Sequence, residues 1–256
     1  MVTIIKTEFI KLKRYFIIWI GVSLMLLTVL LTLFTTMADD GMTWDYQFLF
    51  EQVVKNFVTM IFPMCITLIS GYMISREYTD DTLKNIETLP ISFQKLLAGK
   101  LIVSAILSLF LGIVCFAFTV VANFIMGYDG FAPIPALTGL VQMALLGLFL
   151  YLTMLPIIVL TSRHKGSFLV GVIVAFVYGF IGMFANGLLQ SIYPVSAALG
   201  LINYRAGAEG VMWNKGLCFI SVLAMCAIGV ALMFIKQKPE KRETKKTQRT
   251  APKKGW

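Results

Sequence analysis

Residues 101–126, LIVSAILSLFLGIVCFAFTVVANFIM, contain no charged side chain. A helix needs about 20 apolar residues to cross a hydrocarbon core of about 30 Å, so this stretch predicts a membrane-spanning helix. Moving outward in both directions, the same criterion selects five further charge-free stretches, at 16–37, 57–75, 131–162, 166–204 and 216–235. The sequence therefore predicts an all-α membrane protein with about six transmembrane helices.

The composition agrees with a bilayer environment. Of the 256 residues, 58% are hydrophobic and 14% are charged, and the mean hydropathy is +0.83. A soluble domain of this size has too little interior to bury that much apolar surface. We expect one membrane domain over residues 1–235, followed by a basic tail at 236–256 whose low-complexity composition predicts disorder.

The distribution of positive charge predicts the orientation. Of the 22 Lys and Arg residues, 19 lie before the first apolar stretch, in segments 76–100 and 163–165, or in the tail. The alternate gaps hold only Lys55, Arg205 and Lys215. The positive-inside rule then places both termini in the cytoplasm and the acidic segment 38–56 outside. Basic charge of this kind favours anionic lipid as a partner and gives no folded basic face for nucleic acid.

Several functional classes lack the residues they require. The six apolar stretches contain no Asp, Glu, Lys, Arg or His, which disfavours an ion-coupled carrier or an intramembrane hydrolase. The four cysteines have no CxxC spacing, so we expect neither a metal site nor a disulfide framework. The chain also lacks the GxxxxGK[ST] loop that cradles phosphates, and so we do not expect it to be an ATPase.

Two segments are predicted to leave the simple spanning pattern. At the N-terminus, Ile5, Phe9, Leu12 and Phe16 recur at helical spacing, which favours an interfacial amphipathic helix over a continuation of the first span. The stretch 166–204 is too long for one crossing. We expect its helix to end near Leu189 and a short outer re-entrant or surface helix to follow.

The segment 76–100, REYTDDTLKNIETLPISFQKLLAGK, is the long inner connection between the second and third spans. It fits two short helices separated by Pro90. Leu83, Ile86 and Leu89 would form a small apolar ridge among charged neighbours. Such a ridge could fill a groove on a partner protein or lie on the membrane surface, and the residues alone do not choose between these two.

This segment resembles the cytoplasmic loop of ABC-2-type transporter permeases. Members of that family show a Glu near the end of the second helix, then Thr-Leu, Leu-Pro and a Lys at the start of the third helix. The corresponding positions here are Glu77, Thr82–Leu83, Leu89–Pro90 and Lys100. The amphipathic start, the six spans and the broken segment after the fifth span extend the likeness. Small permeases of this type are similar to those of bacitracin, lantibiotic-immunity and peptide-toxin exporters.

The resemblance implies an ATP-driven exporter in a bacterial plasma membrane, with an amphipathic cargo such as a peptide antibiotic or toxin. It further implies a partner ATPase in two copies, which would bind the ATP and Mg²⁺, and a second permease copy or a homologous permease. The loop would act as a coupling helix in a groove of the ATPase. The expected interface comprises Arg76, Glu77, Tyr78, Thr82, Leu83, Ile86, Leu89 and Pro90.

Small and polar residues form two further stripes. Gly171, Ala175 and Gly179 are spaced four apart, with Asn186 near their continuation, and Thr28 and Thr32 form a milder stripe on the first span. Small residues allow close helix approach in lipid. These stripes could serve packing within the chain, a permease dimer contact or a substrate path. An ion-coupled secondary transporter and a non-transporting sensor or assembly partner remain the alternative functions.

Overall fold

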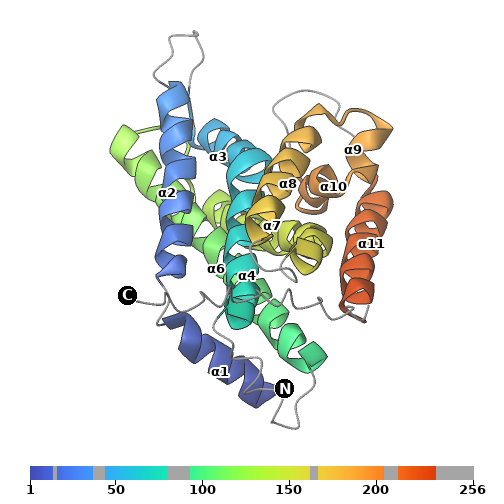
Figure 1. Ribbon diagram of the computed structural model, residues 1–256. Helices are drawn as coiled ribbons and strands as arrows, with labels where there is room; N and C mark the ends of the chain where they lie inside the picture. The colour runs from blue at the N-terminus through green and yellow to red at the C-terminus, as the bar shows by residue number, and fades with distance from the viewer. Residues whose placement is uncertain (14–15, 37–43, 80–92, 162–166, 205–212, 235–256) are drawn as a thin grey trace, which may run out of the picture.

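The computed structural model describes residues 1–13, 16–36, 44–79, 93–161, 167–204 and 213–234. Within these ranges the chain is all-helical, which confirms the all-α part of the predicted fold class. Figure 1 shows a bundle of long helices with the shorter α1 lying across one end. The helices in chain order are α1 Val2–Lys13, α2 Ile17–Thr36, α3 Tyr46–Asn56, the π-helical turn η1 Phe57–Ile61, α4 Phe62–Thr79, α6 Phe93–Met126, α7 Pro133–Thr161, α8 Phe168–Ile181, the 3₁₀ turn η2 Gly182–Phe184, α9 Leu188–Ile192, α10 Pro194–Leu201 and α11 Lys215–Phe234.

Five helical segments in the described chain are long and apolar enough to cross a membrane. They are Ile17–Thr36, Tyr46–Arg76, Gln94–Met126, Pro133–Thr161 and Lys215–Phe234. A sixth apolar segment, Phe168–Phe184, is shorter. Each of the six lies within or overlaps one of the predicted stretches.

The core of the bundle forms around α4, which contacts α2, α6, α7 and α8 (Figure 1). Its side chains Cys65, Ile66 and Ile69 are completely buried. In contrast, α11 presents Phe219, Ile220 and other large apolar side chains at its surface. An apolar exterior of this kind is stable in lipid, where exposed hydrocarbon costs nothing.

The second membrane segment begins earlier than the sequence predicted. The stretch 57–75 was expected to start the span, but the helix continues upstream through η1 and α3 to Tyr46. Asp45 caps it by accepting a 2.7 Å hydrogen bond from the Phe48 backbone N–H, as a good N-cap residue does. Charged and polar residues on one face of α3 interrupt the hydropathy signal, and so hydropathy alone places the start of the span at residue 57.

The fifth predicted helix also differs from its expected limits. It ends at Phe184 after a 3₁₀ turn, not near Leu189, and two short helices follow. Pro194 occupies the first turn of α10, where its missing N–H costs nothing. Because Val195, Ala197 and Ala198 are completely buried and α10 contacts α7 and α11, this segment is part of the protein interior and not a surface helix.

The N-terminal helix is separate from the first span. Figure 1 shows α1 at an angle beneath the other helices, with α2 rising from near its end. It contacts α6. Ile5 and Leu12 of the predicted apolar face pack toward the core, whereas Phe9 and Phe16 are exposed. The break between α1 and α2 agrees with the predicted helix separate from the first span. An interfacial position of α1 stays a prediction.

Candidate functional site

A buried ion pair connects α1 with α6. The Lys100 Nζ donates a hydrogen bond of 2.8 Å to Oε2 of Glu8 and one of 3.0 Å to the backbone carbonyl of Met73 on α4. The Lys11 Nζ donates to the other Glu8 oxygen, also at 2.8 Å. Three helices therefore meet at one ammonium group, and we call Glu8, Lys11, Lys100 and the Met73 carbonyl the Glu8–Lys100 cluster.

The cluster is almost completely removed from solvent, since Glu8 is 2% exposed and Lys100 is 4% exposed. Burial on its own would raise the pKa of Glu8, but the charge and hydrogen bond of Lys100, assisted by Lys11, lower it overall. Glu8 is therefore ionised at neutral pH. Such a buried ion pair holds its helices together, because removing or withdrawing either partner leaves an uncompensated buried charge.

The sequence around the cluster permits the close approach of α1. On the α6 side, Gly99 leaves room for Ile4, whose Cγ2 lies 2.6 Å from the position that a Cβ on Gly99 would occupy. Leu12, 2% exposed, fills the space one turn beyond Glu8. The acid sits among apolar neighbours at i−3 and i+4, which turns it toward the bundle.

The cluster lies at the ends of the helices that flank the predicted coupling segment. Of the residues expected at the ATPase interface, Arg76 is described, and its Nη1 donates to the Tyr72 hydroxyl at 3.1 Å with the guanidinium 5.9 Å from the ring centre. Glu77 and Tyr78 belong to the last turn of α4. The other expected residues, Thr82, Leu83, Ile86, Leu89 and Pro90, lie outside the described residues.

The small-residue stripe on α8 packs within the same chain. A Cβ on Gly179 would lie 2.9 Å from both the Pro63 ring and the Thr59 carbonyl oxygen, and one on Gly171 would collide with the side chain of Thr161. Ala175 between them is completely buried. The π-helical turn η1 ends just before Pro63, which has no N–H to donate. Gly179 covers this irregular backbone.

The threonine stripe on α2 is also used internally. Thr28 donates to the Leu24 carbonyl at 2.9 Å, and Thr32 donates to the Thr28 carbonyl at 3.0 Å. The Thr32 hydroxyl in turn accepts a 2.9 Å hydrogen bond from the Asn56 side chain at the end of α3. Asn186 is separate from both stripes and exposed; its amide donates to the Phe184 carbonyl at 3.4 Å.

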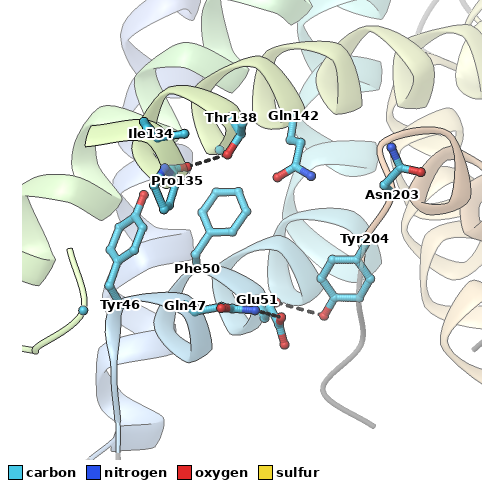
Figure 2. Close-up of a pocket in the computed structure, with 12 residues that line it drawn as sticks. Tyr46, Gln47, Phe50, Glu51, Ile134, Pro135, Thr138, Gln142, Asn203 and Tyr204 are labelled. Carbon is cyan, nitrogen blue, oxygen red and sulfur yellow. Dashed lines mark hydrogen bonds between the residues drawn. The ribbon is translucent and has the colours of Figure 1, made fainter. Parts of the chain in front are cut away.

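Two cavities open at the end of the bundle opposite α1. The first, which we call the Tyr46 cavity, has a volume of about 480 Å³ and lies between α3, the start of α7 and residues 203–204 (Figure 2). The second, the Lys55 cavity, has a volume of about 450 Å³ and lies between α3, η2 and α10. Tyr204 and Glu51 line both cavities, and the Tyr204 hydroxyl donates to the Glu51 backbone carbonyl at 3.1 Å.

Known proteins identify the class of this bundle. A profile of the ABC-2 family transporter proteins matches residues 4–182. The chain belongs to this family. A bacitracin transport permease protein, BCRB, from Bacillus licheniformis is 25% identical over 169 residues, which cover 66% of this chain and 79% of the relative. No solved structure matches the chain. The protein is therefore an ABC-2 transporter permease and a multi-pass plasma membrane protein.

The matched region of this ABC-2 permease contains the whole Glu8–Lys100 cluster. Sequence reasoning identified Lys100 by resemblance but missed Glu8, which was simply one of the polar residues of an amphipathic helix. The pattern that could have revealed Glu8 is its position between Ile5 and Leu12 on one face of the helix. Among the described residues, no group of three or more His, Cys, Asp or Glu side chains could hold a metal ion.

Proposed function

We propose that this chain is the membrane-spanning subunit of an ATP-driven exporter in a bacterial plasma membrane. It crosses the bilayer six times, with Phe168–Phe184 as the fifth crossing and α9–α10 as the outer re-entrant segment. At 1.5 Å per residue this fifth segment is about 25 Å long, near the lower limit for a span. Both termini then lie in the cytoplasm, as the positive charge of the inner segments favours.

The Glu8–Lys100 cluster carries the mechanistic part of the proposal. In this orientation it lies on the cytoplasmic side, where α4 and α6 lead into and out of segment 80–92. A displacement of that segment by a partner would be transmitted to both helices. The buried pair obliges α1 to move with them, because separating the charges is costly. The permease would thus respond as one body to closure of an ATPase.

ATP hydrolysis belongs, in this proposal, to a separate ATPase subunit present in two copies, which binds the ATP and Mg²⁺. A second permease copy or a homologous permease completes the transporter. The cargo is amphipathic, with a peptide antibiotic or toxin as the leading class. Support for this cargo comes from the name of the bacitracin permease relative.

The proposal is tested by co-expressing the chain with candidate ATPase subunits from its own operon. We expect a stable complex and, after reconstitution in vesicles, cargo movement that requires ATP. The double variant Glu77→Ala with Leu83→Asp should lose ATPase binding, whereas Lys215→Gln at the opposite end should retain it. A complex and transport unaffected by the double variant would refute the coupling role, and transport that needs only an ion gradient would refute the exporter.

A further inference from the structure

We propose that the Lys55 cavity binds an anionic amphiphile, with its anionic group at Lys55 and Ser196 and its apolar chain against Met183. The cavity has a volume of about 450 Å³, within the usual range of small-molecule sites of roughly 300–1,000 Å³. It lies at the end of the bundle opposite α1, which is the outer end in the orientation proposed above. The inference concerns binding alone and holds whether or not the occupant is also the cargo.

Lys55 is the one basic residue among the described residues that line this cavity. Its side chain is exposed, and its ammonium group forms no hydrogen bond or ion pair with another described residue. Lys55 and Arg76 belong to one helical segment and are 21 positions apart, which corresponds to about 31 Å at 1.5 Å per residue. This length matches the thickness of a hydrocarbon core. With Arg76 at the inner boundary, Lys55 therefore lies at the level of the outer headgroups.

Ser196 provides an independent indication of a polar ligand. It is 3% exposed and lines the cavity from the first turn of α10. Its hydroxyl forms no hydrogen bond with another described residue, but it is not sealed from solvent, so a molecule in the cavity can reach it. Because buried hydroxyls are nearly always paired, an unpaired one that borders a cavity points to a bound polar group.

Further donors border the same space. The first turn of α10 has no side-chain cap, and the N-terminal end of a helix carries a partial positive charge that favours anions. The side-chain amides of Gln52, Asn186 and Gln190 also line the cavity, and each amide nitrogen carries two N–H donors. An anionic group at Lys55 thus finds additional hydrogen-bond donors.

Glu51 is the one carboxylate among the described residues that line the Lys55 cavity. Its Oε1 accepts a 3.3 Å hydrogen bond from the Gln47 amide. Gln47 lines the Tyr46 cavity and not the Lys55 cavity, and Figure 2 shows the two side chains side by side there. The Oε1 atom of Glu51 is therefore directed toward the neighbouring cavity.

Apolar side chains give the ligand its second property. Val58, Leu199 and Met183 line the cavity. Met183 is 43% exposed and is followed by Phe184, which is 65% exposed. Exposed apolar side chains beside the cavity provide a surface for an apolar chain that extends from it. A lipid of the outer leaflet and a free amphiphile would offer the same combination of anionic group and chain.

The test uses the full chain in nanodiscs after exchange of native lipid for phosphatidylcholine. The probes are hexyl phosphate, hexanol and hexylammonium, and isothermal titration is corrected for binding to empty nanodiscs. We expect hexyl phosphate to bind about 10-fold or more tightly than the other two, because its hydrogen bond with Lys55 is charge-assisted. Lys55→Gln should remove this preference, and Ser196→Ala should weaken binding of hexyl phosphate. The control Lys215→Gln removes the same charge at a position that lines neither cavity and should retain the affinity.

Filling variants show which cavity is occupied. Asn186→Trp replaces an exposed residue at the Lys55 cavity, so the fold should tolerate it, and it should abolish binding of hexyl phosphate. Ile134→Trp, also at an exposed position, fills the Tyr46 cavity and should leave binding unchanged. Equal affinity for the three probes, full affinity in Lys55→Gln, or loss of binding in Ile134→Trp alone would each overturn the proposal.

Native mass spectrometry distinguishes the two sources of the ligand. The chain is released from nanodiscs that contain phosphatidylglycerol, and retained lipid is counted. Phosphatidylglycerol that stays bound to the parent chain and is lost in Lys55→Gln identifies a lipid headgroup as the occupant. Binding of hexyl phosphate without retained phosphatidylglycerol identifies a free amphiphile.

Discussion

Replacing Glu8 by Gln should release α1 from the bundle. The substitution keeps the shape of the side chain but removes the charge opposite Lys100, which lies 2.8 Å away and is 4% exposed. Breaking a buried ion pair on one side costs about 3–5 kcal/mol. Because the Gln oxygen can still accept one hydrogen bond, we take the lower end, about 3 kcal/mol, which corresponds to about a 150-fold shift in the docking equilibrium.

The docking equilibrium can be measured by thiol labelling. Leu12 is 2% exposed on the buried face of α1, so a Leu12→Cys thiol should react with a water-soluble maleimide only when α1 separates from the bundle. Under conditions where closing is faster than labelling, the labelling rate is proportional to the open population. Glu8→Gln, introduced into the Leu12→Cys background, should therefore raise the rate about 100-fold or more.

Two further variants serve as controls for this prediction. Lys6→Gln alters one charge at an exposed position of the same helix and should leave the labelling rate within about twofold of the parent. The double variant Glu8→Gln with Lys100→Met should recover part of the loss, because no uncompensated buried charge then remains. If Glu8→Gln and Lys6→Gln label at the same rate, the Glu8–Lys100 cluster does not hold α1.

Three other outcomes are expected. Gly179→Leu should destabilise the detergent-solubilised protein by about 1–3 kcal/mol through overpacking against η1. The control Gly216→Ala, whose Cβ meets only an ordinary contact at 3.4 Å, should change thermal stability by less than about 1 kcal/mol. Equal losses of stability in the two variants would contradict the packing role of Gly179. The pair Ile4→Cys and Gly99→Cys should form a disulfide under mild oxidation, since the two Cβ positions are 3.6 Å apart, within the usual range of about 3.5–4.5 Å. If both thiols stay reduced on denaturing gels, α1 does not dock on α6 in this way. Because the folded-state pKa of Glu8 is lowered from its ordinary 4.5, its contribution to docking should be complete above pH 4.5 and lost as the pH falls through the lower folded pKa. Spin labels on α1 and α6 should therefore move apart in that acidic range. Separation of the labels between pH 6 and 8 would show that another group is responsible.

Hydropathy predicted most of the bundle because the bilayer imposes one strict rule on sequence. The part of a helix that lies in the hydrocarbon must be mainly apolar, and the charge-free stretches of α2, α6, α7 and α11 obey this rule. The rule fails for α3, because one face of that helix packs in the bundle through Leu49, Val53 and other apolar residues. Its other face carries Gln47, Glu51 and Lys55. It also fails after Phe184, where the interior position of α10 depends on packing against α7 and α11, which no local pattern encodes.

The candidate site was only partly predictable for a similar reason. Lys100 stood out because a resemblance marked the start of the third helix. Glu8 did not, because its partner is 92 positions away and helix periodicity describes only neighbours within the same helix. The Tyr46 cavity could not have been predicted, since it brings together α3, α7 and the chain after α10. Pairing across helices is a property of the folded chain.

The separation of Glu8 and Lys100 also fixes an order of events during synthesis. Chains are made at about 5–20 residues per second, so the 92 positions between the two partners take roughly 5 to 18 s to appear. Throughout that interval α1 carries an acid without its ammonium partner. α1 therefore cannot reach its final position until the start of α6 has been made.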